Sequence, residues 1–354
     1  MFEGELRLDD ATVCKGVSFG APLAAAGELV FNTGMTGYVQ SLTDPSYKGQ
    51  ILVLSYPLIG NYGVPGALQH FESNKIQVTG LIVSDYAARY SHAKATQSLA
   101  EWLKIENIPA LTGIDTRSLV VKLRKEGKKL GKIVHSGQEI DFFDPDLVHI
   151  VDEVSTKKRI QFGAGDIKIG ILDCGVKKSI INAFTTRGCH VELVPWNTDF
   201  TLEDYDGLVI SNGPGHPESC RLIIERLEKF IKTSDKPILG ICLGHQLLGM
   251  AAGLPIYRLP YGHRGQNQPV LLEGTNKSFL TAQNHGYALD TEMMPEGWMP
   301  WFSNLNDESC EGIKHQSKPF FGLQFHPEAS PGPNDSQFVF DLFLDAVKRR
   351  KEKR

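Results

Sequence analysis

PILGICLGHQLL, residues 237–248, is the stretch that decides the fold of the C-terminal half. An apolar run leads into Cys242, and leucines at helical spacing follow it. Gly240 and Gly244 flank the cysteine at a distance of two residues on either side. A strand that turns sharply into a helix needs neighbours without side chains, so this spacing predicts an elbow that brings the Cys242 sulfur into view.

The helix predicted after Cys242 points its N-terminus at the sulfur. Unsatisfied N–H groups and the positive end of the helix dipole favour thiolate, the reactive form, over thiol. The alternative is a buried structural cysteine, which is common for single cysteines in apolar runs. The two glycines and the junction of strand and helix favour a nucleophile.

Apolar runs alternate with predicted helices throughout residues 167–354. The runs lie within IKIGILDCG, HVELVPW, YDGLVISNGPG and PILGIC, and helices are predicted within VKKSIINAFTTRG and near residues 218–233. Parallel strands need such crossovers, and strands that are apolar on both faces have helices on both sides. We therefore expect a doubly wound α/β fold, with a mostly parallel sheet flanked by helices and a ligand site beyond the carboxyl ends of its strands.

Residues 1–150 have a different pattern, in which short runs such as GELVFNTG and QILVLSYP lie between Gly and Pro. This pattern predicts a smaller, mixed β/α domain. Helices are expected over residues 93–106 and 115–126, the second with Asp115 as N-cap and Gly127 as its stop. Periodicity is lost between about residues 137 and 166, so residues 151–166 are expected to form a linker.

The sequence Phe325-His326-Pro327-Glu328 follows the apolar run of residues 320–325. A thiolate nucleophile needs a base and a group that orients the base. Pro327 favours an extended backbone, in which residues two apart face the same side. We therefore expect Glu328 to hold one nitrogen of His326 while the other faces Cys242. His-Pro-Glu alone is more often a surface turn, but its place after an apolar run favours a catalytic pair.

The loop Asn212-Gly213-Pro214-Gly215 ends the apolar run of residues 208–211. Attack on an amide carbonyl produces an oxyanion, which needs preorganised N–H donors. Gly213 offers a backbone N–H without a side chain in the way, and the N–H of Leu243 directly follows the nucleophile. We predict an oxyanion hole formed by Gly213 and Leu243, although NGPG by itself would be an ordinary turn.

Composition and charge exclude several classes of function. The 354 residues carry a net charge of −4, which provides no positive field to gather nucleic acid. The six cysteines include no CxxC pair, so we expect neither a metal site nor a disulfide framework. No apolar run is long enough to span a bilayer, and the acidic start lacks the charge of a secretory signal, so we expect a cytoplasmic protein without membrane attachment.

Four motifs, GICLGHQ, SNGPG, QNHG and FHPE, together resemble the triad-type, class I glutamine amidotransferases. Residues 33–63 and the sequence GIDTR resemble one branch, the small-subunit family of carbamoyl-phosphate synthetase, and the similarity covers essentially the whole chain. The resemblance implies that Cys242, His326 and Glu328 form the catalytic triad. The L-glutamine site that it implies consists of Ser46, Gly213, Gly215, Leu243, Gln246, Asn284, Gly286 and Tyr287.

The resemblance also implies what the chain does. A glutaminase would release ammonia through a cysteinyl thioester and pass it by a tunnel to a large subunit, in a heterodimer or a higher oligomer. That subunit would make carbamoyl phosphate from bicarbonate and ATP, for pyrimidine or arginine biosynthesis. Because this chain has no recognisable phosphate-binding loop, ATP and Mg²⁺ are expected in the large subunit and no cofactor is expected here. The first domain would dock the large subunit and contribute Ser46.

Two residues depart from the family pattern. His216 stands after NGPG, where Asp is usual, and Tyr287 stands after NHG, where Phe is often found. Neither belongs to the triad. His216 puts the detailed geometry of the oxyanion loop in question.

Three other functions are compatible with parts of the sequence. An amidotransferase that supplies another synthase, such as one making guanylate or anthranilate, would share the second domain but not the first. A noncatalytic regulatory subunit would keep the fold, but the loss of Cys, His or Glu that would support it is not seen. A cysteine peptidase uses the same triad, but a site closed around a free amino acid by Ser46, Gln246 and Asn284 speaks against it.

Overall fold

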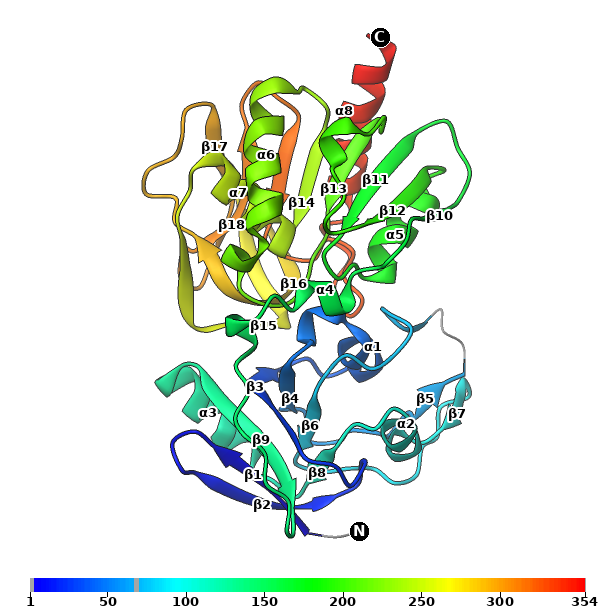
Figure 1. The fold of residues 1–354 in the computed structure, drawn as a ribbon, viewed down its shortest axis with the longest axis vertical. Helices are drawn as coiled ribbons and strands as arrows, with labels where there is room; N and C mark the ends of the chain where they lie inside the picture. The colour runs from blue at the N-terminus through cyan, green and yellow to red at the C-terminus, as the bar shows by residue number, and fades with distance from the viewer. Residues whose placement is uncertain (1–2, 67–69, 354) are drawn as a thin grey trace. The chain divides into compact units, whose positions relative to one another are not determined.

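The computed structural model describes residues 3–66 and 70–353 and divides the chain into two compact units, Met1–Ile150 and Val151–Arg354 (Figure 1). Each unit contains its own clusters of buried apolar side chains. Within the described residues, no helix has the length and the apolar content needed to cross a bilayer.

Seven strands of the first unit close into a barrel, which leaves no open sheet edge in it. Around the barrel they are β1 (Glu3–Leu8), β2 (Val13–Ser18), β8 (Ala110–Thr112), β6 (Gly80–Val83), β4 (Gln50–Leu54), β3 (Ala25–Asn32) and β9 (Lys129–His135). Leu6, Ile51 and Ile133 are fully buried inside it. A separate two-stranded sheet pairs β5 (Val64–Pro65) with β7 (Ala95–Gln97). The predicted mixed β/α domain is present.

The first unit also contains the α-helices α1 (Tyr38–Thr43), α2 (Leu99–Ile105) and α3 (Thr116–Glu126) and the 3-10 helices η1 (Pro45–Tyr47) and η3 (Pro145–Leu147). The helix predicted over residues 115–126 is confirmed, because the Asp115 side chain accepts the Ser118 N–H at 2.9 Å and Gly127 follows with φ 81°. The helix predicted over residues 93–106 was placed too early. It begins at Leu99 because Ser98 and Glu101 form a capping box, and residues 95–97 pair as β7.

The second unit is built on a ten-stranded sheet. In spatial order its strands are β10 (Ile160–Phe162), β12 (His190–Pro195), β11 (Lys168–Asp173), β13 (Gly207–Ile210), β14 (Ile238–Ile241), β19 (Phe320–Leu323), β18 (Cys310–His315), β17 (Trp298–Asn304), β15 (Ile256–Leu272) and β16 (Ser278–Leu289). The strands from β12 to β19 pair in parallel. The pairs from β19 to β16, and the pair of β10 with β12, are antiparallel. The parallel core was predicted, whereas the antiparallel extension makes the sheet more mixed than expected.

Helices cover both faces of the parallel core (Figure 1). The helices of this unit are α4 (Val151–Val154), α5 (Lys178–Thr185), η4 (Phe200–Leu202), η5 (Pro217–Cys220), α6 (Arg221–Thr233), α7 (Leu243–Ala252) and α8 (Phe338–Glu352). Consecutive residues of one strand face opposite sides, so Leu208 packs with α6 and α7 whereas Val209 packs with α5 and α8. This explains the apolar character of the whole strand.

Residues 151–166, expected to be a linker, are part of the second unit. They form α4 and the edge strand β10, which pairs antiparallel with β12. The Thr156 N–H donates to the Asp173 carboxylate at 2.7 Å. Ile160 and Phe162 of β10 are half-buried against the apolar core while Gln161 is exposed, so the segment contributes only a short alternating strand.

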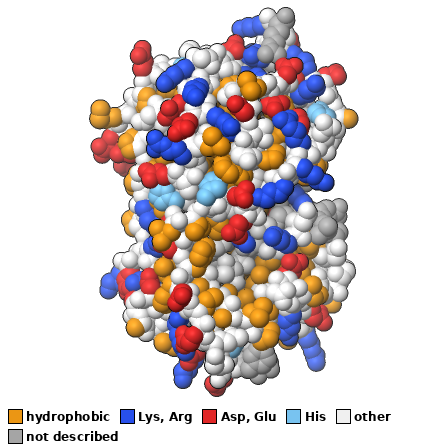
Figure 2. All heavy atoms as spheres, in the orientation of Figure 1, with side chains coloured by type: hydrophobic (Ala, Val, Ile, Leu, Met, Phe, Trp, Pro, Cys, Tyr) orange, Lys and Arg blue, Asp and Glu red, His pale blue; other side chains and the backbone are white. Residues whose placement is uncertain are grey.

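Charged side chains of both signs are interspersed over the face shown in Figure 2, and no single-sign field appears on that face. This distribution agrees with the small net charge of −4. It provides no electrostatic footprint for a polyanion on the face in view.

Candidate active site

Cys242 stands at a sharp turn between β14 and α7. Its backbone has φ 52° and ψ −105°, and a residue with a side chain adopts a positive φ only at a cost in strain. The Cys242 N–H donates to the Leu323 carbonyl at 2.8 Å, which fixes the turn to β19. The structure thus contains the elbow that the sequence predicts.

The two flanking glycines are required by close backbone contacts. A Cβ at Gly240 would lie 2.4 Å from the Gly244 carbonyl oxygen, and a Cβ at Gly244 would lie 2.0 Å from the Ile210 carbonyl oxygen. Real side chains do not approach backbone atoms so closely. The tightness of the elbow therefore follows directly from the two-residue spacing of the glycines.

Cys242 is buried, with 3% of the residue accessible, whereas the elbow was expected to expose its sulfur. Its Sγ lies 3.9 Å from the Asn284 carbonyl oxygen and 3.8 Å from Gln324 Nε2. These neighbours come from β16 and from the segment after β19, which were too distant in sequence to be foreseen as cover. The N-terminus of α7 directly follows the sulfur.

His326 and Glu328 make the predicted contact, but across a turn in which the Ala329 N–H donates to the His326 carbonyl at 3.1 Å, and not along the extended backbone that was expected. The His326 ring meets Glu328 Oε1 through Nδ1 at 2.6 Å, and the His326 N–H donates to the Ala282 carbonyl at 2.9 Å. Burial disfavours the charged imidazole, but the Glu328 carboxylate outweighs burial and, together with Cys242, raises the pKa of His326 to about 10. The imidazole therefore holds a proton at neutral pH, next to the Cys242 side chain.

Lys177 is a buried member of the site that the sequence analysis missed. Its Nζ lies 3.0 Å from Glu328 Oε1 and donates to the Ala329 carbonyl at 2.6 Å. Burial acts to raise the pKa of Glu328, but Lys177 and His326 outweigh it and lower the pKa to about 2. The available signal was a lysine in the short loop between the carboxyl end of β11 and α5, at the edge where the site was expected.

The two predicted oxyanion donors are neighbours, with Gly213 in the loop after β13 and Leu243 at the start of α7. A Cβ at Gly213 would lie 2.0 Å from the Cys174 carbonyl oxygen and 3.0 Å from Leu243 Cδ2, so this position also requires glycine. The Gly244 N–H donates to the Ser211 carbonyl at 3.2 Å, and the Asn212 side chain accepts the Lys177 N–H at 3.2 Å. Leu243 is the first residue of α7, where helix N–H groups lack intrahelical acceptors.

The remaining residues of the expected glutamine site lie in three parts of the chain. Gln246 donates to the Tyr287 carbonyl at 2.9 Å, so α7 is tied to the segment of β16 that also contains Asn284 and Gly286. Gly215 lies in the loop after β13 with φ 87°. Ser46 lies in η1 of the first unit, where its N–H donates to Asp44 at 2.9 Å, so its part in the site stays a prediction.

His216, where the family usually has Asp, keeps a capping role. Its Nδ1 accepts the Glu218 N–H at 3.2 Å at the start of η5, which is a bond that an Asp side chain also makes. The ring of His216 packs edge to face against Tyr287, with centroids 4.6 Å apart. The two departures from the family pattern are thus in contact with each other.

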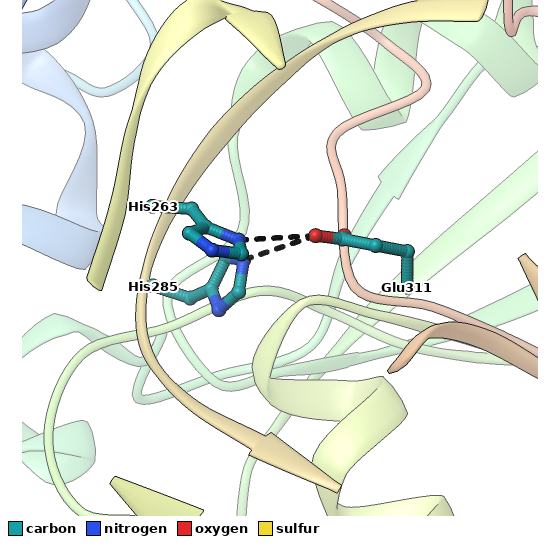
Figure 3. A group of neighbouring side chains, drawn as sticks. All are labelled: His263, His285 and Glu311. Atoms are coloured by element: carbon teal, nitrogen blue, oxygen red, sulfur yellow. Dashed lines mark hydrogen bonds and ion pairs between the residues drawn. The ribbon is translucent and has the colours of Figure 1, made fainter. Parts of the chain in front are cut away.

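His263, His285 and Glu311 place potential metal ligands within 4.8 Å of one another (Figure 3). His263 Nδ1 lies 3.1 Å from Glu311 Oε1, and its Nε2 lies 2.9 Å from Asp307 Oδ2. Burial works against the charged ring, but the two carboxylates outweigh it and raise the pKa of His263. Burial likewise raises the pKa of Glu311, so the three residues form a compact, buried cluster of titratable side chains in which each ring nitrogen of His263 faces a carboxylate.

Comparison with known proteins covers nearly the whole chain. A family model described as "Carbamoyl-phosphate synthase small chain, CPSase domain" matches residues 6–133, and one described as "Glutamine amidotransferase class-I" matches residues 170–346. A mitochondrial "Carbamoyl-phosphate synthase [ammonia]" of Aquarana catesbeiana is 49% identical over 98% of this chain and 24% of its own length. A "Carbamoyl phosphate synthase arginine-specific small chain" of Emericella nidulans is 46% identical over 97% of this chain and 79% of its own length.

Solved structures resemble the chain more distantly. A glutamine amidotransferase of Thermotoga maritima has a TM-score of 0.37 and 20% identity, over 52% of this chain and 85% of that one. The chain spans about a quarter of the vertebrate relatives that it matches, 24% in each of the bullfrog and human proteins.

Proposed function

Because the chain belongs to the carbamoyl-phosphate synthase small chain family, we propose that it hydrolyses glutamine and supplies the ammonia for carbamoyl phosphate synthesis. One observation carries the proposal. Buried Glu328 contacts both Lys177 and His326, and His326 lies beside Cys242 at the elbow. The bullfrog relative is named for ammonia, so the use of glutamine has to be argued from these residues.

In the first half-reaction, the Cys242 thiolate attacks the side-chain amide carbon of glutamine and forms a C–S bond. The oxyanion accepts hydrogen bonds from the N–H groups of Gly213 and Leu243. The C–N bond then breaks as His326 gives its proton to the leaving nitrogen, which departs as ammonia. Because Glu328 keeps His326 protonated at neutral pH, the proton is in place when the nitrogen leaves.

In the second half-reaction, neutral His326 takes a proton from water as the water attacks the thioester. The tetrahedral state collapses and the C–S bond breaks, and the new carboxyl group gives up the remaining proton of the water to solvent as glutamate leaves. Cys242 returns as thiolate and His326 as imidazolium, so the site is restored. The Gln246 side chain donates to the Tyr287 carbonyl, and the Asn284 carbonyl lies near the sulfur; these contacts support a pocket for a free amino acid, which Ser46 is proposed to complete.

Ammonia becomes mostly ammonium in neutral water and then lacks the lone pair needed for attack. We therefore propose that the chain passes ammonia directly to a large synthetase partner, as a heterodimer or higher oligomer. That partner would hold ATP, Mg²⁺ and bicarbonate, and its product would feed arginine or pyrimidine synthesis. The arginine-specific name of the fungal relative supports the first pathway. All six cysteines are free thiols, which supports the proposed cytoplasmic location.

Release of glutamate from glutamine tests the proposal. We expect turnover by the wild-type chain, purified with any large partner that accompanies it, and a loss of at least about a thousandfold in Cys242→Ala. Cys310→Ala is the matched control, because Cys310 is also buried but lies in β18 outside the site. Turnover that survives in Cys242→Ala would show that the nucleophile is another group. Full carbamoyl phosphate synthesis by the chain alone would exclude the subunit role.

A further inference from the structure

His216 and Tyr287 join two loops that the proposed reaction needs in a fixed relation. Their rings meet edge to face, with centroids 4.6 Å apart and an interplanar angle of 61°. His216 directly follows the loop of residues 212–215, which contains the proposed oxyanion donor Gly213. Tyr287 directly follows Gly286 in β16. It lies three residues after Asn284, whose carbonyl oxygen is close to the Cys242 sulfur.

The His216 ring is held by its own backbone surroundings. Its Nδ1 accepts the Glu218 N–H at 3.2 Å, and its carbonyl accepts the Ser219 hydroxyl at 2.7 Å. Rotation of the ring away from Tyr287 would break the cap on η5. The position of the ring is therefore coupled to the path of the loop that precedes it.

Tyr287 is held at both ends. Its carbonyl accepts Gln246 Nε2 at 2.9 Å from α7, and His285 Nδ1 lies 2.9 Å from the same oxygen. Its hydroxyl accepts Arg258 Nη1 at 2.7 Å from β15, where Arg258 is its cross-strand partner. The guanidinium also lies over the ring, 5.1 Å from its centroid. Tyr287 thus offers a stationary surface against which His216 packs.

We propose that His216 and Tyr287 are a positioning pair that sets the Gly213 N–H relative to Cys242. The inference rests on the proposed glutaminase function and adds residues that act through the oxyanion loop. An oxyanion donor works only when it lies at hydrogen-bonding distance from the place where negative charge develops. Loss of the ring contact should therefore affect kcat more than KM, because the donor matters chiefly in the transition state.

A double-mutant cycle tests the pair. His216→Asp keeps an acceptor for the Glu218 N–H but removes the ring, and Tyr287→Leu removes the other ring. We expect His216→Asp to lower kcat for glutamate release about threefold to tenfold, with KM changed less than about twofold. We expect the double variant to be no slower than Tyr287→Leu alone. The effect of His216→Asp would then disappear once the Tyr287 ring is gone, which corresponds to a coupling of about threefold to tenfold in kcat, as for measured aromatic pairs.

His315→Asp is the matched control. His315 Nδ1 likewise accepts backbone N–H groups, from Ser317 at 3.2 Å, and its ring packs edge to face on Trp298 at 5.3 Å. It lies at the end of β18, away from the carboxyl end of β19 that leads to His326. We expect kcat within about twofold of wild type.

The kinetic results distinguish a failure of the positioning pair from a failure of the proposed function. Independent effects of the two substitutions, or a kcat in His216→Asp no lower than in His315→Asp, would overturn the positioning pair while wild-type turnover still upholds the proposed function. Absence of turnover in the wild type would overturn both. Alkylation of Cys242 by iodoacetamide serves as a second readout, since it needs no oxyanion hole. An alkylation rate reduced as much as kcat would place the defect at the nucleophile and contradict the inference.

Discussion

Lys177 Nζ lies 3.0 Å from Glu328 Oε1, and both side chains are almost fully buried. The carboxylate of the proposed triad is therefore paired with two cationic side chains, since His326 lies 2.6 Å from the same oxygen. A buried ion pair is costly to break, because the remaining charge is left without compensation. This relationship connects the chemistry of the site to the stability of the second unit.

Lys177→Met should lower both activity and stability. Glu328 would keep only His326 as a partner, and the bond from Lys177 to the Ala329 carbonyl would be lost. We expect kcat for glutamate release to fall about tenfold and the free energy of unfolding to fall by about 3 kcal/mol. The neighbouring, partly exposed Lys178→Met serves as control. Equal effects of the two substitutions on unfolding in urea would contradict a special role for Lys177.

Glu328→Gln should change the pH dependence of stability. The pKa of Glu328 is lowered from 4.5 to about 2, so the carboxylate stabilises the fold fully above pH 4.5 and loses this effect as pH falls towards 2. Glutamine does not titrate. We expect a difference in unfolding free energy of about 3 kcal/mol at pH 6, which shrinks between pH 4.5 and pH 2. Urea denaturation at pH 6, 4 and 3 measures it, and a difference independent of pH would speak against the charged pair.

Gly244→Ala should disrupt the elbow. The added Cβ would lie 2.0 Å from the Ile210 carbonyl oxygen, so strand or helix must move. We expect a loss of about 3 kcal/mol in stability and no measurable glutaminase activity. Gly274→Ala controls for backbone strain alone, because its φ is 76° and nothing lies within 4 Å of its Cβ; it should cost about 1 kcal/mol. Thermal unfolding that ranks the two variants equally would show that the elbow can relax.

Glu311→Gln should weaken the buried contact between the side chain at position 311 and His263. Glu311 raises the pKa of His263, so its loss leaves a buried imidazole with one carboxylate partner, Asp307. We expect a loss of about 3 kcal/mol, and little change in the exposed control Glu308→Gln. We also expect EDTA to leave the wild-type unfolding midpoint unchanged. A midpoint lowered by EDTA and restored by zinc would instead identify His263, His285 and Glu311 as metal ligands.

Patterns within short stretches of the sequence predicted much of the fold and of the candidate site. The glycines at residues 240 and 244 predicted the elbow because their effect depends only on backbone atoms close in sequence and on the strand beside them. The contact between His326 and Glu328 was predicted correctly, but the extended backbone assumed for it was wrong, because a turn closed by the Ala329 N–H and the His326 carbonyl brings the two side chains together. Asp115 predicted the start of α3 because a cap acts within one turn.

Contacts between distant segments were decided by the tertiary structure. The early start assigned to α2 was wrong because residues 95–97 pair with β5, some thirty residues away. The antiparallel strands from β18 to β16 were not foreseen, since period and propensity do not specify which edge of a sheet a later strand joins. The burial of the Cys242 sulfur depends on Asn284 and Gln324, which approach it only in the folded chain.

The sequence by itself predicted the elbow at Cys242 and the parallel core, because glycine spacing and apolar periodicity act within single stretches of chain, and it proposed His326 and Glu328 as partners of the cysteine. The folded structure alone decided that Lys177 balances the charge of Glu328 and that His216 packs on Tyr287. Charge compensation and ring contact act through space, between side chains that strands and loops bring together from separate parts of the sequence.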